Sequence, residues 1–153
     1  MNKASIFISY SHKDEKWKDL LVNQLGVLEQ QGAFDTWTDR EIGAGEDWSQ
    51  AIEDALKNAT VAVLLVSANS LTSEFILNNE AVRMLERREK EGLRIIPIIV
   101  SDCAWNQVKW LARMQVRPRD GKPLDQVSPA RRATELKNIV AEVGSVIAAR
   151  SSK

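Results

Sequence analysis

Short apolar runs alternate along the chain with longer stretches in which apolar residues recur every three or four positions. The short runs predict five strands, at ASIFIS, AFDTW, TVAVLLV, RIIPIIV and a weaker QVR. The longer stretches predict helices over residues 14–31, 47–58, 74–91, about 105–113, and 130–149. Strands that alternate with helices in this way favour a parallel sheet with helices on both faces.

Two of the runs, TVAVLLV and RIIPIIV, are apolar throughout, as expected of central strands that are covered on both sides. The predicted fold class is α/β: a flavodoxin-like three-layer sandwich with a five-stranded parallel sheet in the order 2-1-3-4-5. In such sheets, ligands bind beyond the carboxyl ends of the strands, near the point where the strand order reverses. We therefore expect a site among the segments that follow the strands: SYSHKD, TDREIGAGED, SANSLTSE and SDCAW.

Local signals refine the element boundaries. Asp47 and Gln50 have the spacing of a capping box that opens the second helix, and Trp48 is expected in the core because it begins that helix's apolar stripe. Gly92 is expected to end the third helix. The segment 117–129 contains three prolines and a glycine and predicts a surface loop.

Length and composition narrow the possible functions. The chain has 153 residues, which predicts one domain. Its 21 Lys and Arg balance 21 Asp and Glu, so its net charge does not favour nucleic acid or an anionic membrane as a partner. A single cysteine and a single histidine exclude an internal disulfide and leave too few ligands for a zinc site. Cys103 and His12 are expected to be surface or filler residues.

The sequence contains no recognisable signal peptide or membrane-spanning stretch. The apolar run near the N-terminus is too short for a signal peptide, and no stretch approaches the roughly 20 apolar residues that span a bilayer. These features predict a cytoplasmic protein. The sequence ends at RSSK, directly after a predicted helix, which is consistent with the N-terminal module of a longer protein.

Several common activities of this fold class lack their motifs. The turn after the first strand, SYSHKD, contains no glycine, which disfavours a dinucleotide-binding Rossmann site. The P-loop pattern G-x-x-x-x-G-K-[ST] is absent. A phosphate-accepting receiver domain needs clustered acids at the end of its first strand, where this chain has Ser9, Tyr10 and Ser11.

What remains is a serine-rich rim with three charged residues near it: Asp39, Arg40 and Glu80. On a helical wheel, Glu80 lies at the border of the apolar stripe that Leu77, Ala81, Met84 and Leu85 define. It is either a solvated glutamate on a helix flank or a carboxylate that leans over the strand ends and contacts a ligand.

Four blocks in this order and spacing carry a family resemblance: IFISYSHKDEKW, WTDREIGAGEDWSQAIEDALKNATVAVLLVSANSLTSEF, the acid Glu80, and RIIPIIV. Together they resemble a Toll/interleukin-1 receptor (TIR) domain, particularly the bacterial kind, over residues 4–149. The resemblance implies that residues 1–153 form a single TIR domain. It also implies that NAD+ is cleaved as a substrate, without a cofactor, into nicotinamide and ADP-ribose or a cyclic ADP-ribose isomer. The family's catalytic glutamate matches Glu80.

This assignment agrees with the chemistry of the bond. Most glycosidases need two carboxylates, one of which protonates the leaving group. The nicotinamide of NAD+ is already positively charged and leaves as a neutral molecule, so no general acid is required. One carboxylate that stabilises the oxocarbenium-like transition state can then be enough.

The resemblance also assigns substrate-binding positions, namely Tyr10, Ser11, Trp37, Asp39, Arg40, Gly43, Ser67 and Ser70. Structural alternatives stay open for them: polar residues at a strand end, an Asp–Arg ion pair that stiffens a loop, a plain turn at Gly43 and Gly45, and helix capping by serine. Many catalytic relatives have a tryptophan four residues before the glutamate, where this chain has Ile76, with Phe75 one position earlier. Either Phe75 takes the part of that stacking aromatic, or Ile76 stands in its place and stacking is weakened.

The expected partners are NAD+ and other TIR domains, which the family contacts through a segment called the BB loop, here residues 38–47. A sensor domain or partner protein would trigger assembly, so the leading hypothesis is an assembly-activated bacterial immune effector, for example in defence against phage. The alternatives are a non-enzymatic adaptor that binds other TIR domains, and a virulence factor. The acid at Glu80 favours an enzyme, whereas the missing tryptophan weighs against one.

Overall fold

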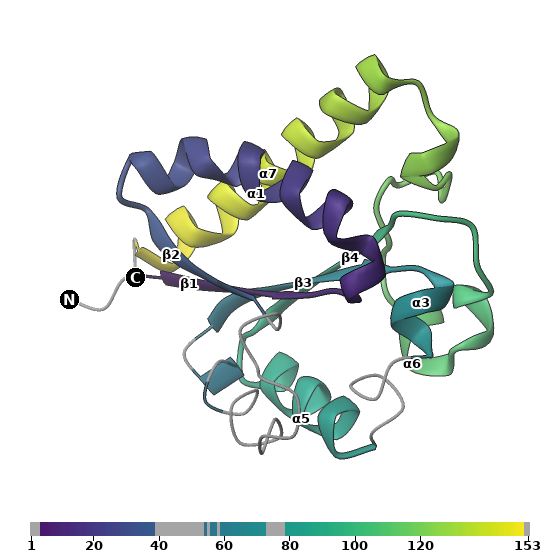
Figure 1. Ribbon diagram of the computed structural model, residues 1–153. Helices are drawn as coiled ribbons and strands as arrows, with labels where there is room; N and C mark the ends of the chain where they lie inside the picture. The colour runs from purple at the N-terminus through teal and green to yellow at the C-terminus, as the bar shows by residue number, and fades with distance from the viewer. Residues whose placement is uncertain (1–3, 39–53, 55, 58, 73–78, 152–153) are drawn as a thin grey trace.

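One parallel sheet forms the middle of the protein. The computed structural model describes residues 4–38, 54, 56–57, 59–72 and 79–151. Within that part, four strands pair in the order β2-β1-β3-β4, with the bounds β1 (Ala4–Ser9), β2 (Phe34–Thr38), β3 (Ala59–Val66) and β4 (Arg94–Ile99) (Figure 1). This agrees with the predicted order of the first four strands.

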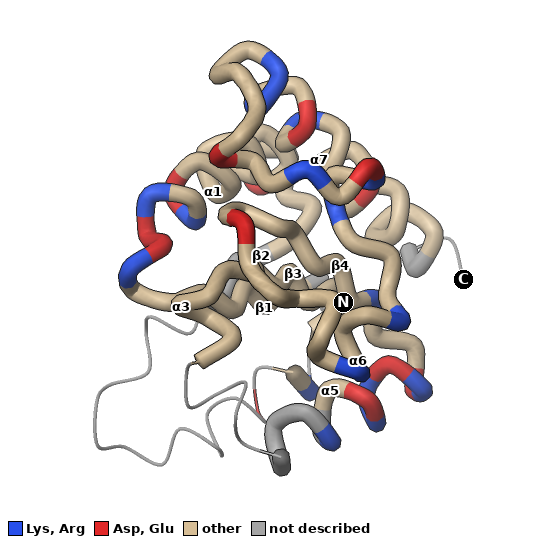
Figure 2. The backbone as a smooth tube through the Cα atoms, turned by 90° about the vertical axis from the view of Figure 1, so that its right-hand side faces the viewer, with Lys and Arg blue, Asp and Glu red and all other residues tan. Residues whose placement is uncertain are grey.

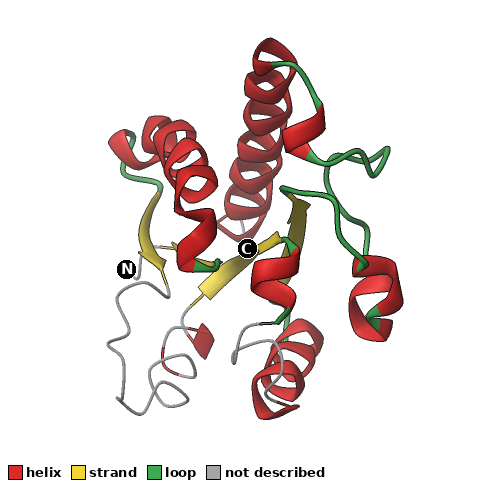
Figure 3. Cartoon of the chain, turned by 45° about the vertical axis from the view of Figure 1, so that its right-hand side comes forward, coloured by secondary structure: helices red, strands yellow, loops and turns green. Residues whose placement is uncertain are grey.

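Helices cover both faces of the sheet, as predicted for a three-layer sandwich. Helices α1 (Glu15–Gln30) and α7 (Pro129–Ser151) lie side by side on one face, and α5 (Asn79–Lys90) lies on the other (Figure 1 and Figure 3). The remaining elements are short: η1 (His12–Asp14), α3 (Ala68–Leu71), η3 (Trp105–Gln107), α6 (Lys109–Ala112) and η4 (Leu124–Gln126). The helix predicted over 47–58 falls almost entirely outside the described residues.

The strands divide their side chains between the two faces. Ile6, Ile8 and Tyr10 of β1 and its continuation pack with the apolar stripes of α1 and α7 in the main core cluster. Leu64 and Val66 of β3 point the other way and pack beside α6. Every residue of β3 after the first is buried, so its unbroken apolar run is explained by cover on both faces.

Two helices end in the same way. Gly92, with a φ of 109°, follows the end of α5; its N–H donates to the carbonyl of Glu89 at 3.1 Å, and the N–H of Leu93 donates to Arg88 at 2.9 Å. Gly32, with a φ of 74°, plays the same part after α1. These bonds form Schellman motifs, in which glycine is favoured because a side chain resists a positive φ. The predicted role of Gly92 is confirmed.

The segment QVR (residues 115–117), predicted to be the fifth strand, does not form a strand in the structure. This prediction is wrong. Only an isolated parallel bridge joins Arg117 to Ile98 of β4. The Arg117 N–H donates to the Pro97 carbonyl at 2.8 Å, and the Ile99 N–H donates to the Arg117 carbonyl at 2.7 Å. The next ladder bond would need an N–H from Pro97, which proline lacks, and Pro118 follows directly. β4 therefore lies at the edge of the described sheet rather than in its middle.

Two further predictions are corrected. The stretch 105–113 forms two short turns, η3 and α6, because Val108 between them adopts an extended backbone with ψ 106°. The segment 117–129 is not wholly a surface loop, since Leu124 and Val127 are buried in the main core cluster. A backbone hydrogen bond of 3.0 Å from Asp125 to the carbonyl of Val100 ties this segment to the chain that leaves β4.

An ion pair between a buried arginine and a partly buried glutamate holds the same segment against α7. The guanidinium of Arg117, whose side chain is 6% exposed, donates to both carboxylate oxygens of Glu142, which is 19% exposed. It also donates to the carbonyl of Gln115 at 2.6 Å. These hydrogen bonds are the main reason that the pKa of Glu142 lies below its ordinary value, and they outweigh the opposing effect of partial burial.

We expect Glu142→Gln to lower the free energy of unfolding at pH 7 by about 3 kcal/mol, because it leaves the Arg117 charge buried without its partner. A matched control is Glu135→Gln on the same helix, whose carboxylate lies 3.8 Å from Arg131; its expected loss is under about 0.5 kcal/mol. Urea unfolding measures both values. Equal losses for the two variants would contradict the role of the buried pair.

The same pair predicts a pH dependence. A carboxyl whose pKa is lowered by folding contributes stability above its unfolded pKa, here 4.5, and that contribution is lost as the pH falls through the lowered pKa. The stability difference between wild type and Glu142→Gln should therefore be constant above pH 4.5 and shrink below it. Unfolding midpoints measured from pH 7 down to pH 3 give this profile.

Candidate functional site

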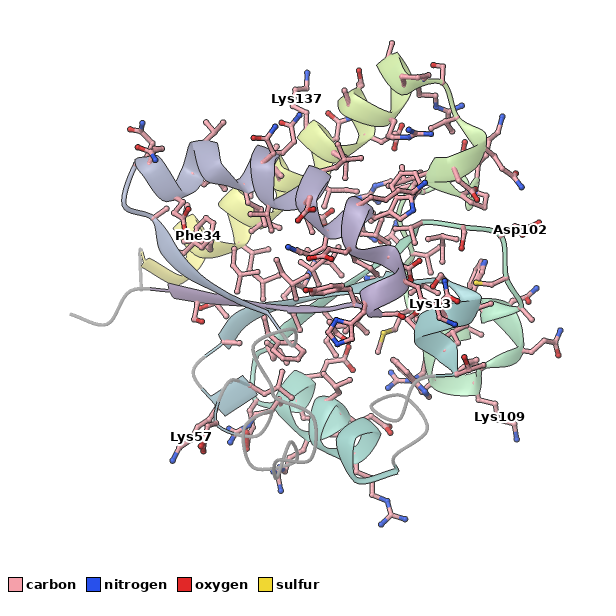
Figure 4. The ribbon with its side chains drawn as sticks, in the orientation of Figure 1. Lys13, Phe34, Lys57, Asp102, Lys109 and Lys137 are labelled. Carbon is pink, nitrogen blue, oxygen red and sulfur yellow. The ribbon has the colours of Figure 1, made fainter. Side chains whose placement is uncertain are left out.

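The segments that leave β1 and β3 meet at the switch point of the sheet. After β1 the chain enters η1 and α1 on one face, and after β3 it enters α3 on the way to α5 on the other (Figure 1). In Figure 4, Phe34 and Lys57 mark the end where strands begin, and Lys13 and Asp102 mark the end where they finish. Open α/β sheets bind ligands in the crevice at this end, where connections diverge to opposite faces.

The buried carboxylate of Asp14 connects the two segments that meet at the switch point. Asp14 is 4% exposed and accepts a hydrogen bond from the Ser67 hydroxyl on one carboxylate oxygen and from the Asn69 amide, at 3.2 Å, on the other. We call Asp14, Ser67 and Asn69 the strand-end clasp, since they join the segments after β1 and β3 across 53 residues of sequence.

Sequence reasoning missed Asp14 for an identifiable reason. The residue is the N-cap of α1, a position where aspartate is common because it accepts bonds from the first helical N–H groups. In the structure its side chain makes no such bond and turns to Ser67 and Asn69 instead. Nothing in the local pattern distinguishes an aspartate that caps its own helix from one that binds a distant segment.

Ser67 and Ser70 form a capping box at the start of α3. The Ser70 N–H donates to the Ser67 hydroxyl at 3.1 Å, the Ser67 N–H donates to the Ser70 hydroxyl at 2.9 Å, and the Ser70 hydroxyl donates to the Ser67 carbonyl at 3.1 Å. Both residues are buried. Helix capping by these serines is confirmed, whereas their contact with a substrate stays a prediction.

Tyr10 and Ser11 also have structural contacts. The Tyr10 ring is 4% exposed and lies in the core cluster on the face of α1 and α7, with the ammonium of Lys18 5.5 Å from its centroid and the His12 ring edge-on at 6.2 Å. The Ser11 hydroxyl accepts from the Lys13 N–H at 3.3 Å and so caps η1. Their assignment as substrate-binding residues stays a prediction.

Glu80 is the second residue of α5, the helix on the face of the sheet opposite α1 and α7, and Tyr10 packs in the core cluster under α1 and α7. Trp37 lies in β2, in register with Phe7 of β1. The side chains of Glu80 and Trp37 are outside the described part, and so are the following residues in full: Asp39, Arg40, Gly43, Gly45, Asp47, Trp48, Gln50, Phe75 and Ile76. The predictions that concern them, including nearly all of the BB loop (38–47), are therefore not tested by the structure.

Cys103, which follows β4, is half-buried. Burial is the main cause that raises the pKa of its thiol, and the negative charges of Asp102, Asp125 and Asp14 add to the increase, while a backbone hydrogen bond from Trp105 opposes it. A thiol with a raised pKa holds its proton at neutral pH and is a poor nucleophile. This agrees with the interpretation of Cys103 as a filler residue.

Elsewhere in the described residues we find no metal site, and a cleft beside α7 has no excess of one charge. Among them, no group of three or more His, Cys, Asp or Glu side chains is placed to hold a metal ion. A cleft of about 590 Å³ between α7 and residues 117–120 carries arginines and acids in equal number, Arg117, Arg119 and Arg131 against Asp120, Glu135 and Glu142. Figure 2 shows the same mixture of positive and negative residues along α7. No helix of the described part is long and apolar enough to cross a membrane.

Comparison with known proteins matches the chain to one family model and to one relative. A family model described as TIR domain matches residues 6–128. The protein y4lF of Sinorhizobium fredii (strain NBRC 101917 / NGR234), described as uncharacterized, is 42% identical over 122 residues; the match covers 80% of this chain and 38% of that protein. The chain thus spans well under half the length of this relative.

Two solved structures match this chain at 22% sequence identity. The TIR domains in the activated Roq1 resistosome, which directly recognizes the pathogen effector XopQ, give a TM-score of 0.50 over 91% of this chain and 84% of the matched chain. The TIR domain of the Toll-related receptor TRR-2 of Hydra magnipapillata gives 0.43 over 64% of this chain and 71% of the matched chain.

The capping geometry gives a stability prediction. Ser67→Ala removes the cap of α3 and one of the donors to the buried Asp14, so we expect it to lower the free energy of unfolding by about 2–3 kcal/mol. Ser128→Ala is the matched control, because the exposed Ser128 hydroxyl accepts from the Arg131 N–H at 3.2 Å at the start of α7. Its expected loss is about 1 kcal/mol. Urea unfolding compares the two, and a smaller loss for Ser67→Ala would contradict this account.

Proposed function

Because the chain belongs to the TIR domain family, we propose that it is an NAD+ glycohydrolase or cyclase that breaks the bond between nicotinamide and ribose. The products are nicotinamide and either ADP-ribose or a cyclic ADP-ribose isomer. The observation that carries the proposal is the position of Glu80, in the first turn of a helix that follows β3 at the switch point of the sheet.

Glu80 supplies the negative charge for this reaction. As the bond between the ribose C1 and the nicotinamide nitrogen breaks, its electron pair goes to the nitrogen, and nicotinamide leaves uncharged. The positive charge that develops on the ribose is stabilised by the carboxylate of Glu80. A carboxylate in the first turn of a helix is itself favoured by the positive end of the helix dipole. Water then attacks C1 and loses a proton, or a base nitrogen of the substrate attacks and gives the cyclic product.

Assembly activates the enzyme in this proposal. TIR domains bind one another, and the neighbour of similar fold in the Roq1 complex comes from an activated assembly. The BB loop (38–47) is the proposed contact between protomers, and a sensor domain or partner protein triggers their association. The greater length of y4lF supports additional domains in related proteins. The proposed setting is a cytoplasmic bacterial immune effector, with a virulence factor as the alternative biological role.

A non-enzymatic adaptor that binds other TIR domains is the second candidate. The observation that favours it is the engagement of the Ser67 and Ser70 hydroxyls in the capping box, together with Ile76 at the position of the family's tryptophan. An adaptor needs the fold and its binding surfaces but no open pocket beside Glu80. The two candidates therefore differ in whether NAD+ is consumed.

Nicotinamide release separates the candidates. Concentrated or artificially clustered protein is incubated with NAD+, and nicotinamide is measured by chromatography for wild type, Glu80→Ala and Glu80→Gln. We expect both Glu80 variants to lose about 100-fold to 1000-fold in turnover, as for removal of a transition-state-stabilising group. Glu86→Gln is the matched control on α5, because Glu86 is 43% exposed and pairs only loosely with Arg113, at 3.5 Å; it should keep wild-type turnover.

Two outcomes would overturn the proposal. If clustered wild-type protein releases no nicotinamide above background, the chain is an adaptor. If Glu80→Ala releases nicotinamide as fast as wild type does, the catalytic carboxylate is a different residue.

A further inference from the structure

We propose that Asp14 is a positioning residue of the site: it fixes the start of the segment that leads from β3 to Glu80. Its carboxylate belongs to the chain after β1, while its two partners, Ser67 and Asn69, belong to the chain after β3. These segments lie on the two sides of the switch point, the region where ligands of this fold class bind. The clasp therefore sets how far apart those sides stand.

The hydrogen-bond directions show why a carboxylate is needed. The Ser67 hydroxyl has one proton, which it donates to Asp14, and the same oxygen accepts from the Ser70 N–H. The Asn69 amide donates to the other carboxylate oxygen. Asp14 accepts one bond on each of its two side-chain oxygens, which an asparagine cannot do in the same way because one of its two terminal groups is a donor NH₂. The clasp thus orients Ser67 and, through its capping box, the whole of α3.

The position of Asp14 in its own helix supports a role beyond local folding. At the N-cap of α1 its carboxylate makes no capping bond and is directed to the neighbouring segment. An N-cap aspartate normally stabilises its helix, so this arrangement gives up a local contribution for a contact between segments. Asp14 does not touch the substrate in this proposal, and it acts through the backbone that begins at Ser67.

A reciprocal exchange tests the clasp. In Asp14→Asn, the new amide can still accept from Ser67, but its NH₂ group faces the NH₂ group of Asn69. In Asn69→Asp, two carboxylates face each other. The double variant Asp14→Asn/Asn69→Asp restores a donor opposite an acceptor with the direction reversed. Asn69→Ala serves as a milder variant if Asp14→Asn does not fold.

The first readout is amide hydrogen exchange, which does not depend on NAD+ cleavage. The Ser70 N–H donates to the Ser67 hydroxyl and the Leu71 N–H to the Ser67 carbonyl, at 3.1 and 3.0 Å. We expect exchange at Ser70 and Leu71 to accelerate about tenfold in each single variant, since tenfold corresponds to the net loss of about one hydrogen bond. The double variant should return toward wild type. Unchanged exchange in Asp14→Asn, or no recovery in the double variant, would overturn the clasp.

The second readout is turnover, and it rests on the proposed function. At saturating NAD+, Asp14→Asn should lower kcat about tenfold to 100-fold with a smaller change in KM, because a misplaced catalytic group loses rate. Glu142→Gln is the control: it weakens the fold at a distance from the clasp, so kcat per folded molecule should not change. Wild-type kcat in Asp14→Asn would overturn the positioning role. If wild type cleaves no NAD+ while exchange responds as expected, the proposed function fails and the clasp stands.

Discussion

β3 pairs in parallel with β1 on one side and β4 on the other, and its side chains are buried on both faces of the sheet. Two parallel strands cannot be joined by a tight turn. Each strand is therefore followed by a crossover connection that runs over one face of the sheet. With the order β2-β1-β3-β4, the connection after β1 runs over one face and the connection after β3 over the other. This pairing therefore sets the switch point between β1 and β3, and it places the described candidate residues Tyr10, Ser11, Ser67 and Ser70 in the segments that follow these two strands.

Charged side chains hold separate segments together at two places around this sheet. At the carboxyl ends of β1 and β3, Asp14 joins the two segments that follow these strands. Beside the edge of β4, Arg117 makes a single bridge to the strand and an ion pair to Glu142 of α7. In both cases the charged group has its hydrogen-bonding partners, as a buried charge requires.

This arrangement bears on how a TIR domain can act on a ligand. The serines and the tyrosine at the strand ends already have partners in the protein or lie in its core, so their described contacts are structural. The proposed chemistry asks little of them, because a leaving group that departs uncharged needs one stabilising carboxylate and no proton donor. Hydrogen-bonded strand ends at the switch point and one acid on α5 are consistent with that division of roles.

The sequence by itself determined the fold class, the order of the first four strands, the main helices and the end of α5 at Gly92, because apolar periodicity and glycine signals are local. Family membership was likewise readable from four ordered motifs. Tertiary structure alone decided that QVR would be a single bridge, since this depends on Pro97 lying opposite it. It also decided that Asp14 binds Ser67 and Asn69 rather than capping α1. Whether a side chain bonds to a neighbour in sequence or to a distant segment depends on which segments the sheet brings together. A local sequence pattern does not contain that information.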